Sequence, residues 1–320
     1  MELIIKPTGR CNFNCTFCSA NMLNIKHCNS VPNQLKEILQ NLNPHSLIIT
    51  GGDPLMVEPK YYNELLSLGE WNISLTTNLK DFYFNPKKWV DIFCNPRVGI
   101  CTSFQYGNQR LWDKNTPYTE EKFKEVCALF NHYVGYNPSF IAVINKENED
   151  RAIDHVYLAK QLNTKVKLNP VMQIGLSTES YPKYKMVDIW LKIKELNLLE
   201  YVDMDIQFIK GGCGFNTNGL CSSTIRAVYL DNNGLIHYSN CEECLSSKDY
   251  QIPIDAMQPN PAREKINYKT VINNKCLECE LCNLCNGCKI AQDIAKQDSN
   301  YCQEMLKRKE RILESGWKLG

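Results

Sequence analysis

Three cysteines near the start of the chain are spaced so that their thiolates can bind one metal centre. Cys11, Cys15 and Cys18 have the spacing C-x3-C-x2-C, directly after the pair Gly9-Arg10 and the short apolar run Leu3-Ile4-Ile5. Thiolates are soft ligands that select iron–sulfur clusters and zinc. A cubane cluster has four irons, so three cysteines leave one iron without a protein ligand. At such an iron a further molecule can bind and react.

Zinc binding and disulfide bonding are the two other common uses of clustered cysteines. Structural zinc sites usually have four ligands, often as two C-x2-C pairs, and the triplet is one ligand short of that. The 17 cysteines of the chain would also allow a disulfide framework. However, the N-terminus has no leader of the secretory kind, which argues for a reducing, cytoplasmic compartment. We therefore interpret the triplet as iron–sulfur ligands.

The spacing of the triplet strongly resembles the signature of the radical SAM superfamily. This resemblance implies a 4Fe–4S cluster whose open iron binds S-adenosyl-L-methionine (SAM). It also implies reductive cleavage of SAM to a 5′-deoxyadenosyl radical, which removes a hydrogen atom from a substrate.

Composition and charge exclude several other classes of protein. The chain has 320 residues, a net charge of +1 and 43% hydrophobic residues. This balance gives no electrostatic reason to bind nucleic acid or a membrane surface. The basic run at residues 307–311 contains an acid and is interpreted as a solvated helix face. No apolar stretch approaches the ~20 residues that span a bilayer.

Strand-like and helix-like segments alternate through the first two thirds of the chain, which predicts a parallel α/β sheet. The expected strands are 3–5, 47–50, 73–77, 98–104, 140–144 and 166–168, and the expected helices are 33–42, 61–68, 86–93, 120–133, 151–162 and 185–196. Periodicity alone leaves a doubly wound sheet and a barrel open. The radical SAM resemblance implies a partial (β/α)6 TIM-type barrel at residues 1–205, with a small cysteine-rich domain at 206–320.

In such barrels the loops after the strands carry the ligands. The triplet follows the first expected strand, and Gly51-Gly52-Asp53-Pro54 follows the second. The tetrapeptide resembles the Gly-Gly-Glu-Pro motif of the superfamily, whose backbone and acid hold the amino group of SAM. Asp53 stands where Glu is commoner. By the same resemblance, further SAM contacts are expected from Phe17, Thr77, Asn78, Ser103, Gln105 and Asn145.

Ten of the 17 cysteines lie after residue 212, around a hairpin expected at 227–238 with an Asn-Gly turn. This region resembles the SPASM extension of radical SAM enzymes, which carries two auxiliary 4Fe–4S clusters. Carried over by position, the first cluster has the ligands Cys213, Cys221, Cys241 and Cys288. The second has the ligands Cys276, Cys279, Cys285 and Cys302.

The C-terminal cysteines depart from the SPASM pattern in three ways. Two residues, not three, separate Cys285 from Cys288; six, not four, separate Gly234 from Cys241; and Cys282 is an additional cysteine. The ligand set is therefore open by one member among Cys282, Cys285 and Cys288. A ferredoxin-like run is an alternative, although its usual proline is replaced by a lysine after the last cysteine. A zinc ribbon is another.

Three residues of this region are candidates for direct roles in catalysis. Glu242 follows Cys241, at the position where SPASM sulfatase-maturing enzymes carry an acidic general base. Cys244 and Cys282 are thiols outside the expected ligand sets, and a spare thiol can return a hydrogen atom to a substrate radical, which would give epimerisation.

The leading functional hypothesis is a radical SAM/SPASM enzyme of ribosomal-peptide maturation that crosslinks, oxidises or epimerises a peptide or protein. Its expected partners are a reductant such as flavodoxin or ferredoxin and a separate leader-binding protein. Because the chain starts at its first strand, leader recognition is expected to need that protein or another surface. A second hypothesis is a dehydrogenase or epimerase of a carbohydrate or other small-molecule substrate. A third, from a different class, is an iron–sulfur electron carrier.

Overall fold

The computed structural model describes residues 2–20, 23–203, 225–239, 278–281 and 295–316. The described residues divide into two compact units. One contains residues 2–141, 174–178 and 225–239, and the other contains 142–173, 179–203, 278–281 and 295–316.

The first unit is built on a parallel sheet in which neighbouring strands follow chain order. Its strands are β1 (Glu2–Lys6), β2 (Ser46–Ile49), β3 (Asn72–Thr76), β4 (Val98–Ser103) and the start of β7 (Ser139–Ile144). β1 pairs with β2, β2 with β3, β3 with β4, and β4 with residues 139–141 of β7, always in parallel. All their carboxyl ends therefore meet at one edge, which carries the loops of the expected site.

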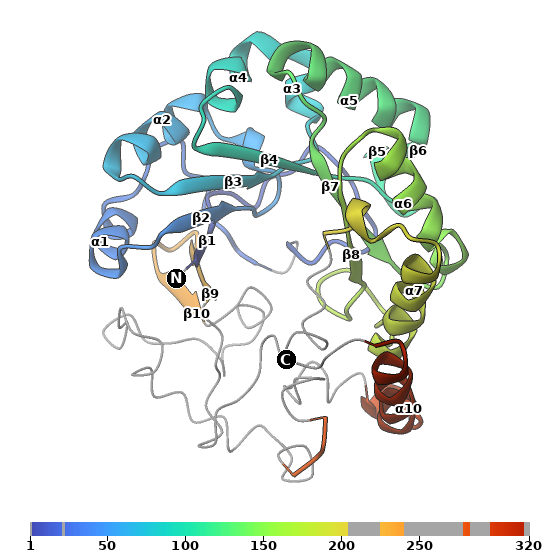
Figure 1. The fold of residues 1–320 in the computed structure, drawn as a ribbon. Helices are drawn as coiled ribbons and strands as arrows, with labels where there is room; N and C mark the ends of the chain where they lie inside the picture. Colours follow the sequence, from blue (N-terminus) through green and yellow to red (C-terminus); the bar gives the residue numbers. More distant parts are fainter. Residues whose placement is uncertain (1, 21–22, 204–224, 240–277, 282–294, 317–320) are drawn as a thin grey trace. The chain divides into compact units, whose positions relative to one another are not determined.

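Helices line the outer side of these strands (Figure 1). They are α1 (Asn33–Leu42), α2 (Pro59–Leu68), α3 (Lys80–Phe84), α4 (Pro86–Phe93) and α5 (Glu120–Val134). α1 buries Leu35, Ile38 and Leu39, which share one helical face. α2 and α4 begin at prolines, whose fixed φ and missing N–H suit the first turn. Thr119 caps α5 by accepting the Lys122 N–H.

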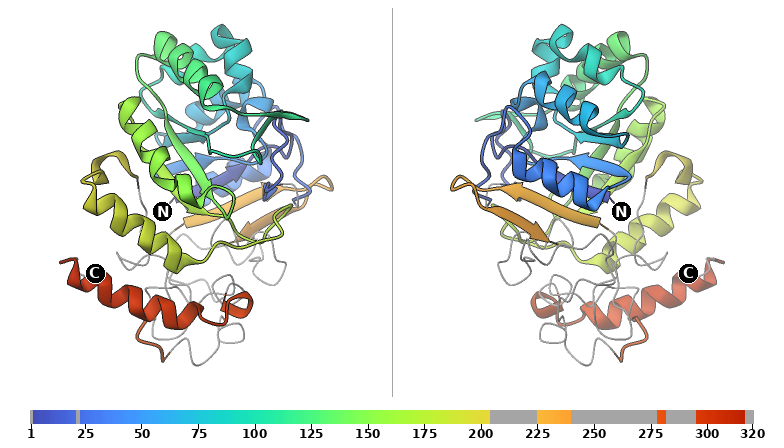
Figure 2. Two further views of the ribbon diagram at one scale, coloured as in Figure 1. Left: turned by 90° about the vertical axis from the view of Figure 1, so that its right-hand side faces the viewer. Right: turned by 90° about the vertical axis from the view of Figure 1, so that its left-hand side faces the viewer.

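The predicted hairpin is present, and it extends the parallel sheet. β9 (Ile225–Leu230) pairs in parallel with β1 and antiparallel with β10 (Ile236–Ser239). Gly234 closes the turn with a φ of 81°, a value that glycine adopts without strain. Figure 2 shows the hairpin, in orange, running beside the blue strands. The sequence places this hairpin between cysteines of the auxiliary region, but its pairing partner is the first barrel strand.

The second unit continues the strand–helix alternation. It contains the end of β7, η3 (Glu149–Arg151), α6 (Ala152–Gln161), β8 (Val166–Pro170), α7 (Lys183–Glu195), η4 (Leu199–Tyr201) and α10 (Tyr301–Glu314). α10 is joined to α7 by an ion pair of Arg311 with Asp188 at 2.6 Å and by the rings of Tyr184 and Tyr301, 6.3 Å apart. Leu281 and Met305 complete a small buried cluster there with Tyr301.

The expected fold class is confirmed: within the described residues, the strands β1, β2, β3, β4, β7 and β8 alternate with helices in the order of a partial parallel α/β barrel. The short elements were missed. The five-residue helix α3 and the hairpin of β5 (Leu111–Asp113) and β6 (Thr116–Pro117) are too short to show a periodicity. None of the described helices has the length and apolarity to cross a membrane.

Two phenylalanines of α3 provide a test of the core. Phe82 is fully buried, with ring centroids 5.4 Å from those of Phe93 and Phe130, whereas Phe84 is 61% exposed. We expect Phe82→Ala to lower the free energy of unfolding by about 3–5 kcal/mol, because it leaves a cavity that the core cannot fill. Phe84→Ala, the matched control, should cost far less. Urea unfolding of both variants measures these losses of stability. Equal losses in the free energy of unfolding would contradict this packing of Phe82.

Candidate functional site: the cysteine loop

The loop that follows β1 carries the three cysteines and is held by residues 109–111, at the start of β5. The backbone N–H of Asn14 donates to the Leu111 carbonyl at 3.2 Å, and that of Thr16 donates to the Gln109 carbonyl at 2.9 Å. Cys15 and Cys18 are half-buried and Cys11 is exposed. The loop therefore presents its thiols from a backbone fixed on both sides of Cys15.

Polar groups of the protein point at two of the thiols. The Phe13 N–H and the Asn78 side-chain amide lie 3.4 and 3.6 Å from Cys11 Sγ, and the Arg110 guanidinium lies 4.0 Å from Cys15 Sγ. Hydrogen bonds to sulfur are among the features that set the reduction potential of an iron–sulfur cluster. The donors around these sulfurs suit anionic thiolates bound to iron.

The thiols are close enough to influence one another. Protein atoms crowd the Cys11 thiol although the residue reaches the surface. This desolvation, with the charge of Asp53 and the nearby Cys15 and Cys18 thiols, raises its pKa to about 12. Burial also raises the pKa of Cys15, against the opposing effect of Arg110. Because a metal must displace these protons, loading of the site is expected to improve with rising pH.

Among the described residues, no three His, Cys, Asp or Glu side chains are arranged to hold a single metal ion. A cubane cluster is larger than an ion, and its ligands stand farther apart. The three-thiol donor set, with its mutual charge effects and its donors to sulfur, fits a cluster with one open iron.

Gly51 and Gly52 let the second loop lie directly on the backbone of the cysteine loop. A Cβ on Gly51, whose φ is 133°, would stand 2.5 Å from the carbonyl oxygen of Thr8. A Cβ on Gly52 would overlap the carbonyl oxygen of Arg10. The contact is a hydrogen-bonded one: the Gly52 N–H donates to Thr8 at 2.8 Å and the Asp53 N–H donates to Arg10 at 2.7 Å. Only glycines allow this approach.

The Asp53 carboxylate is buried and accepts hydrogen bonds from other residues of the protein. It is 1% exposed and accepts hydrogen bonds from the N–H groups of Leu55 at 2.9 Å and Asn78 at 2.7 Å, and from the Thr77 hydroxyl at 3.0 Å. Desolvation raises its pKa to about 6, although the hydrogen bonds oppose the shift. The carboxylate therefore joins the segments that follow β2 and β3. Pro54 begins η2 (Pro54–Met56), which Asp53 caps.

Thr77 and Asn78, expected as SAM contacts, lie between Asp53 and the cysteine loop. Thr77 donates its hydroxyl proton to Asp53, and the Asn78 amide donates to Asn12 Oδ1 at 2.8 Å besides facing Cys11. Both side chains are thus placed at the site, with the Asn78 amide toward a predicted cluster ligand.

Arg110 is a site residue that the sequence analysis missed. Its guanidinium donates to Ser103 at 2.9 Å and to Gln105 at 3.3 Å, and lies 5.2 Å above the ring of Phe17. The Arg110 side chain therefore contacts three residues that were predicted to contact SAM. No sequence signal marks it, since a single arginine between two short strands has no pattern.

Two buried donors at this place have no acceptor among the described residues: Nε of Arg110 and Nε2 of Gln105. Buried N–H groups are nearly always hydrogen-bonded in proteins, and leaving one unpaired costs free energy. A bound ligand with acceptor oxygens would satisfy both donors.

Asn145, a further predicted contact, belongs to the second unit. It is fully buried, and its side-chain oxygen accepts the N–H groups of Glu147 at 2.9 Å and Asn148 at 3.2 Å, which shapes the turn after β7. Of the predicted auxiliary ligands, Cys279 and Cys302 are described. Burial and the neighbouring Cys279 raise the pKa of Cys302, so these two thiols lie near each other.

The remaining predicted residues of the auxiliary region lie outside the described residues. They are Cys213, Cys221, Cys241, Glu242, Cys244, Cys276, Cys282, Cys285 and Cys288.

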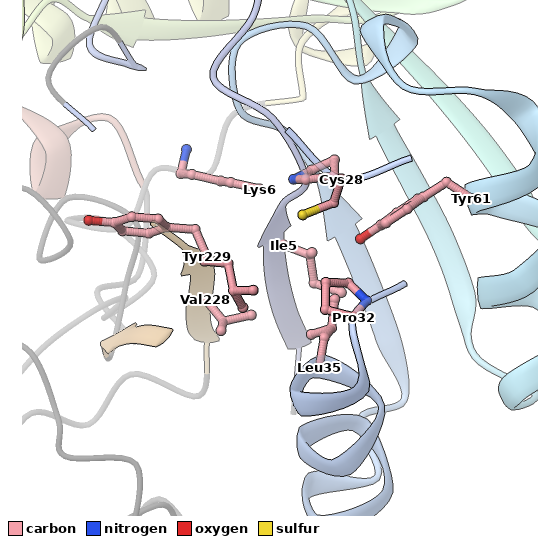
Figure 3. A pocket seen from close by; sticks show the side chains of 10 residues that line it. Ile5, Lys6, Cys28, Pro32, Leu35, Tyr61, Val228 and Tyr229 are labelled. Atoms are coloured by element: carbon pink, nitrogen blue, oxygen red, sulfur yellow. The ribbon is translucent and has the colours of Figure 1, made fainter. Parts of the chain in front are cut away.

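Cys28 belongs to a separate small pocket. Figure 3 shows it near Ile5 and Tyr61, with Tyr229 of β9 at the other end of the pocket. The Cys28 thiol is 3.6 Å from the Lys26 carbonyl oxygen, and burial raises its pKa. The lining is mostly apolar, as expected for a structural thiol.

The chain was compared with protein families, curated proteins and solved structures. Residues 5–159 match the model of the Radical SAM superfamily. A solved structure of a polyhistidine-tagged protein, "anSMEcpe with bound AdoMet", is similar, with a TM-score of 0.67, 17% sequence identity, and coverage of 98% of this chain and 97% of that chain. At this identity the likeness concerns the fold. A comparison with curated proteins found no significant match.

The glycine contact predicts how the cysteine loop is held. We expect Gly52→Ala to push the loop away from Arg10, to lower the iron bound per chain after anaerobic reconstitution, and to cost about 1–3 kcal/mol of stability. Gly99→Ala is the matched control, because no atom lies within 4 Å of a Cβ there. Iron analysis and urea unfolding check this. Equal iron content in both variants would refute it.

The buried Asp53 predicts a pH dependence of the iron-free protein. Its pKa in the folded state is about 6, against an ordinary value of 3.8. The folded state therefore binds this proton more tightly than the unfolded state, and stability from this group falls as the pH rises from about 4 to about 6. Relative to Asp53→Asn, the wild type should lose up to about 3 kcal/mol across this window. Parallel unfolding profiles of the two proteins would disprove it.

Proposed function

We propose, from the Radical SAM superfamily domain that residues 5–159 form, that the chain reductively cleaves SAM and uses the 5′-deoxyadenosyl radical to remove a hydrogen atom from a peptide or protein. The superfamily implies a 4Fe–4S cluster and SAM. Maturation of a ribosomal peptide by crosslinking, oxidation or epimerisation is the reaction type we propose.

One observation carries the proposal: the loops after β2 and β3 and the segment after β4 all contact the cysteine loop after β1. The cysteine loop lies on Gly51 and Gly52, Asn78 faces Cys11, and Arg110 faces Cys15. An electron carrier needs cluster ligands but no such set of cofactor contacts. The bound AdoMet named for the similar solved structure supports the same ligand here.

In this proposal each part of the site has one task. Cys11, Cys15 and Cys18 would hold three irons of a 4Fe–4S cluster, which would leave the fourth iron open to bind SAM. The backbone of residues 51–54 receives the amino group of SAM. Arg110 and Gln105 supply the two unpaired N–H groups for acceptor oxygens of SAM.

Bound SAM and the reduced cluster supply the radical chemistry; the residues around them position the reactants and exclude water. Asp53 serves indirectly, since it fixes Thr77 and Asn78 and through Asn78 the environment of Cys11. Phe17, covered by the Arg110 guanidinium, provides the aromatic surface proposed for the adenine.

We further propose two auxiliary 4Fe–4S clusters in the C-terminal region. Support comes from Cys279 and Cys302, two predicted ligands of one cluster, whose thiols lie near each other. Glu242 is the proposed general base, and Cys244 and Cys282 are the proposed hydrogen donors if the product is an epimer. A flavodoxin or ferredoxin is the proposed reductant, and a separate protein is proposed to bind the peptide leader.

The proposed function predicts a specific cysteine requirement. After anaerobic reconstitution with iron and sulfide, the wild type should form 5′-deoxyadenosine from SAM under strong reductant, and Cys15→Ala should fall to background because one iron loses its ligand. Cys94→Ala is the control: Cys94 is exposed, and its thiol contacts the Tyr133 carbonyl at 3.8 Å. Chromatography of the nucleoside products is the measurement. A wild type that holds zinc, or that forms no 5′-deoxyadenosine, would overturn the proposal.

A further inference from the structure

A lysine that was not among the predicted site residues is hydrogen-bonded to the backbone of the cysteine loop. Lys80, the first residue of α3, is 9% exposed, and its ammonium donates to the carbonyl of Asn12 at 3.1 Å. It also donates to the carbonyl of Trp112 and to the carboxylate of Asp113 at 2.7 Å. One charged group thus connects the segment between Cys11 and Cys15 to the β5–β6 hairpin.

Aromatic rings surround the same ammonium. It lies 5.0 Å from the ring centroid of Trp112 and 5.9 Å from that of Phe13, and these two rings are 5.5 Å apart. A cation near aromatic faces is attracted by their quadrupoles, and most strongly where water is excluded. Phe13 also gives its N–H to Cys11 Sγ at 3.4 Å. Lys80 therefore contacts both residues that follow Cys11.

The turn before Lys80 has an unusual backbone that directs it to this place. Leu79 is fully buried and has a φ of 61°, in the left-handed region that a branched side chain seldom adopts. Two side chains hold the turn: the Leu79 N–H donates to Thr77 Oγ1 at 3.1 Å, and the Lys80 N–H donates to Asn78 Oδ1 at 2.8 Å. Strained backbone of this kind persists where the surroundings over-determine it.

We propose that Lys80 is a positioning residue for the predicted cluster: it fixes the Cys11–Cys15 segment and places a positive charge beside the iron-binding loop. The inference rests on the proposed function. Asp113 offsets part of the charge, but its side chain is 61% exposed and therefore hydrated, whereas that of Lys80 is 11% exposed. A charge next to a cluster changes its reduction potential, because the added electron is stabilised by a nearby cation.

The test compares substitutions of Lys80 in the reconstituted full chain. Lys80→Met keeps an apolar stem against Trp112 but removes the charge, Lys80→Gln keeps a donor for the carbonyls without the charge, and Lys80→Arg keeps the charge. The readout is the electron paramagnetic resonance signal that changes when SAM is added, since only a cluster with an open iron responds. Its midpoint potential is measured by redox titration.

We expect Lys80→Gln and Lys80→Met to lower the midpoint potential of the SAM-responsive signal. We expect Lys80→Met also to reduce its intensity, because no donor holds Asn12. Lys80→Arg should keep the wild-type potential. Lys122→Met is the matched control: Lys122 also lies over Trp112, at 6.0 Å, but its hydrogen bonds go to Tyr83 and Glu125.

Each outcome separates the two proposals. A wild type without a SAM-responsive signal means that the proposed function fails. A wild type with that signal, and Gln and Met variants with unchanged potential and intensity, means that the Lys80 inference fails. If Lys80→Met does not fold, as judged by circular dichroism, the potential of Lys80→Gln decides. A shift equal to that of Lys122→Met also refutes the inference.

Discussion

The close contact between two loop backbones is the constraint on which the site depends. The cysteine loop and the Gly51-Gly52 loop approach so closely that a single Cβ at either glycine would meet a carbonyl oxygen. The approach is directional, because two N–H groups of the second loop donate to carbonyls of the first. Loops of this kind are otherwise the mobile parts of a barrel. Here backbone hydrogen bonds hold the cysteine loop, so its thiols take no part in this contact.

Three buried charged side chains, those of Asp53, Lys80 and Arg110, connect the loops around the cysteines. Asp53 joins the segments after β2 and β3. Lys80 connects the cysteine loop to the β5–β6 hairpin, and Arg110, the residue before that hairpin, contacts Ser103 and Cys15. Burying a charge is expensive unless it is hydrogen-bonded. Asp53 and Lys80 meet that condition with protein partners alone. Arg110 does so only in part, since its Nε has no acceptor among the described residues, and it is therefore the charge that a bound molecule would complete.

The sequence predicted those site residues that stand in a short contiguous motif. The C-x3-C-x2-C spacing and the Gly-Gly-Asp-Pro run are contiguous, and both stand after apolar strands that the structure confirms as β1 and β2. It did not predict Arg110 or Lys80. Each is a single basic residue near a short element, and its contact with the cysteine loop joins distant parts of the chain. The separation is 68 positions for Lys80 and Asn12, and 95 for Arg110 and Cys15.

What the sequence determined by itself was therefore the spacing of the three cysteines and the order of strands and helices, because spacing and hydrophobic period are local properties. The tertiary structure decided which polar groups surround the thiols. It turned the Asp53 carboxylate inward to Thr77 and Asn78, and it paired the β9–β10 hairpin with β1. Both outcomes depend on contacts between segments that are distant in the chain. Many other partners are possible for these segments, and only the folded backbone selects one.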